Sequence, residues 1–176
     1  MRRVVVLLFV MAFVLKMGGL AMSPVVQDPL NRPKKAKATE LYVVRNTPRG
    51  IRNNNPGNLR KTSINWKGEI VGDDPDFEQF ESMELGVRAL TKNLLYSMEV
   101  LGNNTLRNIL LRWAPPTENK TEGYIRSVSW YTGIDPDEVL GRQHLYDLTR
   151  AIIRHENGQL IDDKIIHIGI HRALYD

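Results

Sequence analysis

Residues 50–60 read GIRNNNPGNLR, a stretch that contains three consecutive asparagines, two glycines and one proline. Regular helices and strands disfavour this composition, whereas turns built from asparagine, glycine and proline favour it. We therefore predict a rigid polar turn at this point of the chain. Asn54, Asn55 and Asn58 carry both donors and acceptors, so they can either hold the turn in shape or face a sugar-like ligand.

The positive charge of the chain is concentrated in its first 40 residues. The 176 residues have a formal net charge of +4, of which residues 1–40 contribute +5 and the remainder −1. Because the remainder is not basic, the composition argues against nucleic-acid binding. The absence of cysteine excludes disulfides, thiolate metal sites and a cysteine nucleophile. The four histidines do not have a recognised ligand spacing, so no metal or other cofactor is expected.

The amino terminus has the pattern of an export signal. Residues 1–22 begin with two arginines, continue with an apolar run over residues 4–15 and then reach the small residues Gly19 and Ala21. The segment is interpreted either as a signal peptide cleaved after Ala21 or as a membrane anchor. Both interpretations place the rest of the chain on the extracytoplasmic side of a membrane. Residues 23–40, rich in proline and lysine, are predicted to be a linker.

Residues 41–176 are predicted to form one mostly α-helical domain with a small β-hairpin. The hairpin is expected within residues 61–80, where glycines and Asp-Asp-Pro separate short apolar pieces. Apolar residues at helical spacing predict helices over residues 85–101, 106–113, 121–131 and 142–156. A short helix is also expected from Asp135, where proline and acidic residues follow. Residues 161–175 are apolar enough to pack on the domain, and their secondary structure stays open.

Glu156 is distinguished by its place on the helix predicted over residues 142–156. Leu145, Leu148 and Ile152 define the buried face of that helix, and Glu156 continues it four residues later. A carboxyl group at the end of a buried face is partly desolvated, which favours its protonated form and suits it to donate a proton. The alternative is a structural role, in a salt bridge with a core arginine or exposed at a frayed helix end.

Several motifs together resemble those of the lysozyme-like superfamily, above all its lytic transglycosylases and autolysin-type glucosaminidases. These motifs are the turn at residues 54–60, the Trp66-Lys67-Gly68 sequence, the aromatic pair within residues 77–80, and a helix ending in Glu156 before Asn-Gly. The glutamate helix comes first in that superfamily, so the order here corresponds to a circular permutation, which compact domains with neighbouring termini allow. The sequences RGIRNNNPGN, WAPPTEN and HENG also resemble phage and prophage virion proteins described as structural or cell-wall-lytic.

The resemblance implies a lysozyme-like fold and cleavage of the β-1,4 bond between N-acetylmuramic acid and N-acetylglucosamine in peptidoglycan. Glu156 would protonate the leaving oxygen and then act as a base, toward the sugar's own 6-hydroxyl in a transglycosylase or toward water in a hydrolase. Trp66 and Tyr124 would be sugar-stacking surfaces, or else core residues. Asn54, Asn55 and Asn58 would shape the turn beside the glutamate.

A hydrolase would need a second carboxylate, and a transglycosylase would not. The candidates lie in the predicted hairpin: Glu69, Asp73, Asp74 and Glu78. We favour the transglycosylase because spacing distinguishes none of the four. The alternative function is a non-catalytic virion structural or cell-wall-binding protein built on the same fold. The expected partners are peptidoglycan, the membrane through residues 1–22, and virion components.

Overall fold

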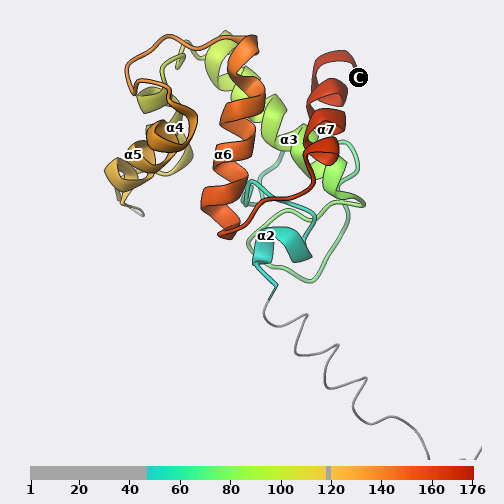
Figure 1. Cartoon of the computed structure of the whole chain (residues 1–176). Coiled ribbons are helices and arrows are strands. Elements are labelled where there is room, and N and C mark those ends of the chain that lie inside the picture. The colour runs from blue at the N-terminus through green and yellow to red at the C-terminus, as the bar shows by residue number, and fades with distance from the viewer. Residues whose placement is uncertain (1–46, 118–119) are drawn as a thin grey trace, which may run out of the picture.

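The computed structural model describes residues 47–117 and 120–176, and this part of the chain is mostly helical, as predicted (Figure 1). The elements are α2 (Arg49–Arg52), α3 (Met83–Leu95), the π-helical turn η1 (Tyr96–Val100), α4 (Leu106–Trp113), α5 (Thr121–Thr132), the 3-10 turn η2 (Arg142–His144), α6 (Leu145–Asn157) and α7 (Asp163–Tyr175). The predicted signal peptide or anchor and the predicted linker lie outside the described residues. None of the helices in the described ranges is long and apolar enough to cross a membrane.

Helix α6 lies in the middle of the fold, with α3 and α7 on one side and α4 and α5 on the other (Figure 1). Its Leu148 and Ile152 are fully buried, as are Leu90 of α3 and Leu110 of α4. All four belong to one hydrophobic core. Because α6 is packed on both sides, its carboxyl end is held in a fixed place relative to the other helices.

The four longer helices predicted from apolar spacing are confirmed, and their ends follow ordinary capping chemistry. The hydroxyl of Thr105 accepts a hydrogen bond from the Asn108 amide at 3.2 Å, which caps the start of α4. Gly133 and Gly158 adopt φ angles of 75° and 66° and end α5 and α6. Residues 161–175, left open by the sequence, contain α7. The π-helical turn η1, which continues α3, was not predicted.

Two predictions about the loops are wrong. No helix forms at Asp135, because its carboxylate accepts the Asp137 amide at 2.9 Å and its carbonyl accepts the Glu138 amide at 3.1 Å, and together these bonds close a tight turn. Residues 61–80 form no strand, although two isolated antiparallel bridges, Arg60 with Phe77 and Glu69 with Phe80, pin the segment. The glycines and the Asp-Asp-Pro sequence interrupt the ladder after single bridges.

The asparagine-rich stretch is a polar turn, as predicted, except that its first residues belong to the single helical turn α2. Asn54 and Asn58 adopt φ angles of 50° and 47°, a left-handed conformation that asparagine tolerates better than most residues. The turn rests on the first turn of α3, where Gly86 has no side chain. A Cβ atom at Gly86 would lie 1.8 Å from the carbonyl oxygen of Asn54. The close contact of the turn with α3 therefore depends on a glycine at this position.

Candidate functional site

The carboxylate of Glu156, at the end of α6, accepts hydrogen bonds from three side chains. Oε1 accepts from the hydroxyl of Tyr124 at 2.8 Å and from the indole Nε1 of Trp113 at 3.3 Å. Oε2 accepts from Nδ2 of Asn58 at 3.0 Å. Glu156 is half-buried and forms no ion pair within the described part of the chain, in contrast to the alternative of a salt bridge with a core arginine. Donors from α4, α5 and the asparagine turn thus fix the orientation of a single carboxylate.

Tyr124 is a core residue whose hydroxyl reaches the site. Its side chain is 5% exposed, and its ring stacks on His155 with the ring centroids 3.6 Å apart. Burial, and after it the neighbouring carboxylate of Glu156, raises the pKa of Tyr124 well above its usual range. Its hydroxyl therefore remains a hydrogen-bond donor to Glu156 at any physiological pH. Burial also lowers the pKa of His155, with the Glu156 carboxylate acting in the opposite direction.

One asparagine of the turn contacts Glu156, and the others hold the backbone. Asn55 is fully buried; its Nδ2 donates to the carbonyls of Leu59 and Glu78, each at 2.9 Å, and its Oδ1 accepts the Leu59 amide. Nδ2 of Asn54 donates to the carbonyl of Phe80 at 3.0 Å. Asn58 donates to Glu156. Asn54 and Asn55 therefore shape the turn, and neither lines the cleft described below.

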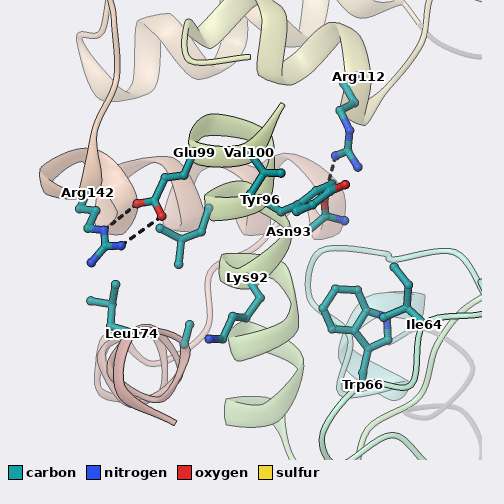
Figure 2. A pocket seen from close by; sticks show the side chains of 12 residues that line it. Ile64, Trp66, Lys92, Asn93, Tyr96, Glu99, Val100, Arg112, Arg142 and Leu174 are labelled. Atoms are coloured by element: carbon teal, nitrogen blue, oxygen red, sulfur yellow. Dashed lines mark hydrogen bonds and ion pairs between the residues drawn. The ribbon is translucent and has the colours of Figure 1, made fainter. Parts of the chain in front are cut away.

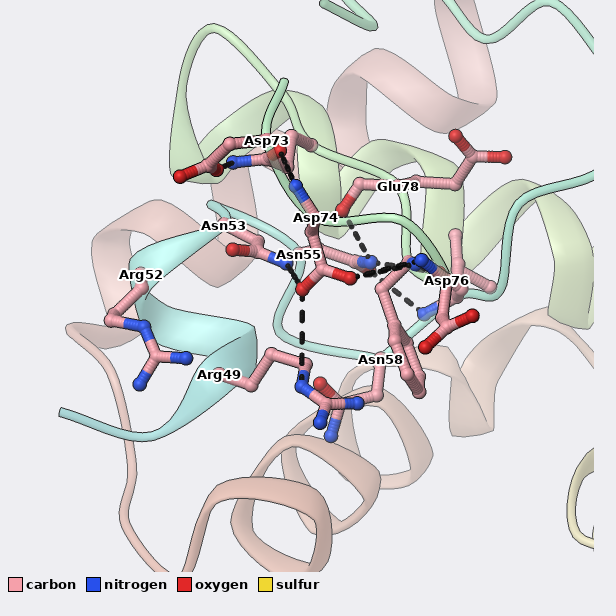
Figure 3. A network of polar contacts seen from close by, with 12 residues as sticks. Arg49, Arg52, Asn53, Asn55, Asn58, Asp73, Asp74, Asp76 and Glu78 are labelled. Atoms are coloured by element: carbon pink, nitrogen blue, oxygen red, sulfur yellow. Dashed lines mark hydrogen bonds and ion pairs between the residues drawn. The ribbon is translucent and has the colours of Figure 1, made fainter. Parts of the chain in front are cut away.

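Next to Asn55, Figure 3 shows a second polar cluster that ties the turn to the segment after Gly72. Asp74 accepts hydrogen bonds from Nδ2 of Asn53 at 2.8 Å and from the amide of Phe77 at 3.1 Å, and Arg49 lies 3.8 Å away. The Asn53 bond is the main reason that the pKa of Asp74 is lowered, and burial opposes it. This cluster fixes the far side of the turn that carries Asn58.

Glu156 and Asn58 line a cleft of about 520 Å³. Its walls bring together the turn, the loop after it and the end of α4. The aromatic lining residues are Trp66, Phe77 and Trp113, and the cationic ones are Arg60 and Arg112. Glu156 is the one carboxylate among the described residues that line the cleft. Trp66 thus lies where a bound ligand would contact it, whereas Tyr124 is not part of the cleft lining.

The four acidic residues considered as a second carboxylate lie outside this lining. Glu69 accepts the Trp66 amide at 3.1 Å, and Asp73 accepts a bond from Gln79 at 3.2 Å. Glu78 is 1% exposed and accepts the Thr62 amide at 3.1 Å, and burial raises its pKa. With Asp74 in the cluster of Figure 3, all four carboxylates bond to their own loop. No group of three or more acidic or histidine side chains in the described ranges is placed to hold a metal ion.

Trp113 is a residue of the site that its sequence pattern does not single out. Its spacing with Leu106, Ile109 and Leu110 predicts a place on the apolar face of the helix, and in the structure its ring packs partly against the core while its indole nitrogen donates to Glu156. The sequence feature that could have indicated Trp113 is the resemblance of residues 113–119 to phage proteins. Glu118 and Asn119, in the same motif, lie outside the described residues.

The fold and the site define a small helical protein with one oriented carboxylate in an aromatic-lined cleft. Comparison with known proteins finds 39% identity to Protein P5 of Pseudoalteromonas phage PM2 over an alignment of 114 residues, which covers 62% of this chain and 71% of that protein. The chain belongs to the family of this phage protein. No protein-family model matches the chain.

Proposed function

We propose that this protein cleaves the β-1,4 bond between N-acetylmuramic acid and N-acetylglucosamine in peptidoglycan, as a lytic transglycosylase. The observation that carries the proposal is the environment of Glu156, the one carboxylate among the described residues lining a cleft with aromatic walls. A single carboxyl group is sufficient when the sugar's own 6-hydroxyl replaces water as the attacking group. It protonates the leaving oxygen first and then removes the proton of that hydroxyl.

The packing of distant motifs supports the proposed lysozyme-like fold in circularly permuted order. Asn58 and Glu156 are 98 residues apart in the sequence and are bonded at 3.0 Å. The Trp66 motif lines the same cleft as both residues. The motifs on which the resemblance rests thus converge on one site, as a permuted enzyme would require.

The orientation of Glu156 fits the role of an acid followed by a base. Tyr124 and Trp113 both donate to Oε1, and Asn58 donates to Oε2. Because the three donors come from different segments, the carboxylate cannot rotate without losing at least one hydrogen bond. A carboxyl group that is held in place can approach one bond of a bound substrate without first paying the entropy of alignment. The aromatic rings of Trp66 and Phe77 would contact the apolar faces of the sugars.

The test is mass spectrometry of the products released from purified peptidoglycan by the protein and by Glu156→Gln. We expect anhydro-muropeptides from the wild type and a loss of roughly 100- to 10,000-fold in the variant, the contribution typical of a general acid. Glu81→Gln, which removes an exposed carboxylate outside the cleft, is the matched control and should retain activity. Products with reducing ends would show a hydrolase instead.

The second candidate is a virion structural or cell-wall-binding protein without catalysis, and its support is the family membership shared with a phage protein. In that case the bonds to Glu156 would serve only to join α6 to the turn. Absence of any cleavage product, together with binding of wild type and Glu156→Gln to the wall, would favour this candidate. Either function would place residues 41–176 on the extracytoplasmic side or on the virion.

A further inference from the structure

A second pocket adjoins the Glu156 cleft, between α3, η1 and α7 (Figure 2). Its volume is about 480 Å³. Four residues line both spaces: Ile64, Trp66, Asn93 and Arg112. A ligand held at Glu156 therefore has a neighbouring space of similar size, with the Trp66 loop and Arg112 at the boundary.

The walls of this second pocket are largely apolar. Leu95 and Ala173 form buried parts of the lining, and Leu174 adds a half-buried side chain from α7. Tyr96 and Val100 are 49% and 66% exposed, which is high for large apolar side chains. Both belong to η1, a π-helical turn of the kind that often marks functional sites. The turn thus presents apolar surface to the pocket, where a ligand can cover it.

The lining of this pocket carries more positive than negative charge. Arg142 is paired with Glu99 at 2.6 Å, so these two charges cancel. Arg112 donates to the neutral Asn93 at 2.7 Å. Lys92 forms no ion pair within the described part of the chain, and Figure 2 shows it on α3, with Leu174 on one side and Trp66 on the other. The pocket therefore combines apolar walls with two cations that lack a carboxylate partner.

We propose that this pocket binds the peptide stem of the muramic acid residue whose glycosidic bond lies at Glu156. The inference rests on the proposed function and specifies its substrate as peptide-substituted glycan. Once the lactyl carboxyl group carries the peptide, the glycan chain is neutral, so the carboxylates of the polymer lie on the stem beside methyl side chains. Apolar walls and cations without a carboxylate partner complement that combination, whereas a neutral sugar would supply no carboxylate to Lys92 or Arg112.

Substitution of Lys92 tests this pocket separately from the Glu156 cleft, because Lys92 lines the pocket and does not line the cleft. The probes are MurNAc-L-Ala-D-Glu, which carries the stem carboxylates, and the neutral tetramer of N-acetylglucosamine. Binding to the full-length protein is followed through the indole N–H signals in nuclear magnetic resonance. Trp66 borders both spaces, Trp113 only the cleft, and Trp130 neither.

We expect MurNAc-L-Ala-D-Glu to shift the Trp66 signal and to leave Trp130 unchanged. Lys92→Met should weaken its binding by about 5- to 10-fold, the range for losing one partly exposed charged contact, without changing the binding of the neutral tetramer. Lys92→Arg should retain binding. Lys164→Met, an exposed lysine at the start of α7, should alter neither affinity. Equal affinity of wild type and Lys92→Met for MurNAc-L-Ala-D-Glu would overturn the proposal.

Cleavage assays on intact peptidoglycan and on glycan strands stripped of peptide distinguish this inference from the proposed function. Faster cleavage of the intact material, with the preference lost in Lys92→Met, would support both. Equal cleavage of the two substrates would overturn the role of the stem and leave the enzyme assignment standing. Lys92-dependent binding with no cleavage of either substrate would support the binding of the peptide stem in this pocket and would overturn the proposed enzymatic function.

Discussion

Replacing Gly86 by alanine should destabilise this protein, although alanine is usually the better residue inside a helix. Gly86 lies in the first turn of α3, beneath the asparagine turn. A Cβ atom there would lie 1.8 Å from the carbonyl oxygen of Asn54 and 2.9 Å from Cδ of Pro56. Contacts of this kind are rarely shorter than 3.0 Å, so α3 and the turn would have to separate by about 1.2 Å. The obstacle is a backbone atom, which cannot rotate away as the end of a side chain can.

Two opposing effects set the size of the change. Alanine in place of glycine favours a helix by about 1 kcal/mol. Overpacking of a close contact costs about 1–3 kcal/mol, and we take the upper end because the obstacle is backbone. The net loss in the free energy of unfolding is therefore about 2 kcal/mol. Movement of the turn would also displace Asn58 from Glu156, so the variant that remains folded should have a weakened site.

Urea unfolding followed by circular dichroism measures this loss, and Gly123→Ala is its matched control. Gly123 is also in the first turn of a helix, α5, but a Cβ atom there would meet only the Cβ of Lys120, at 4.0 Å. Gly123→Ala should therefore stabilise the protein, by about 0.5–1 kcal/mol. If both variants gained stability, the turn would not rest on α3 as described, and this explanation of the site's position would be refuted.

Three further predictions concern the charged and polar groups around the turn and the site. The lowered pKa of Asp74 means that its carboxylate contributes stability above its usual value of 3.8 and loses it as pH falls through the folded pKa. The difference in unfolding free energy between wild type and Asp74→Asn should therefore shrink in urea titrations below about pH 4. The effect of Glu78 on stability has the opposite sign, because burial raises its pKa above 4.5 and folding therefore disfavours its charged form. Glu78→Gln should unfold at a higher urea concentration than the wild type at pH 7, but not below pH 4, where Glu78 is protonated in both states. If the proposed function holds, Tyr124→Phe should lower kcat by about 10- to 100-fold with little change in KM, because the shorter of the two hydrogen bonds to Oε1 of Glu156 is lost. Unchanged muropeptide release would contradict this positioning role.

The helices could be predicted from the sequence because apolar spacing and caps act locally. Leu145, Leu148 and Ile152 recur with helical period, and the structure buries all three. The same stripe continues to Glu156, whose carboxylate lines the cleft. The prediction of a short helix at Asp135 is wrong for an equally local reason. An aspartate side chain can accept a hydrogen bond from the amide two residues later in a tight turn as readily as it can cap a helix.

The partners of Glu156 could not be predicted in the same way, because they depend on packing between distant segments. Trp113 has the spacing of a core residue and packs, partly buried, against the core, and its exposed part and its indole N–H make it part of the site. Asn55 has the same side chain as Asn58, yet it is fully buried in backbone hydrogen bonds. Asn54 and Asn58 share left-handed backbone angles, yet only Asn58 reaches the carboxylate, so the contact is decided by how the turn packs against the end of α6.

Asn157, the residue after Glu156, connects the core to the site. Asn157 is 7% exposed, and its Nδ2 donates to the carbonyl of Pro56 at 2.8 Å as well as to Ile153 within α6. It thus bonds the end of α6 directly to the turn that carries Asn58. Two consecutive residues therefore make separate contacts with one turn: Asn157 holds its backbone, and Glu156 accepts a bond from its side chain. Because the first contact is buried and the second faces the cleft, the position of the carboxylate is set by core packing, and its hydrogen bonds only orient it. Under the proposed function, the side chain of Glu156 could therefore exchange its hydrogen-bond partners for a substrate while the turn remains in place.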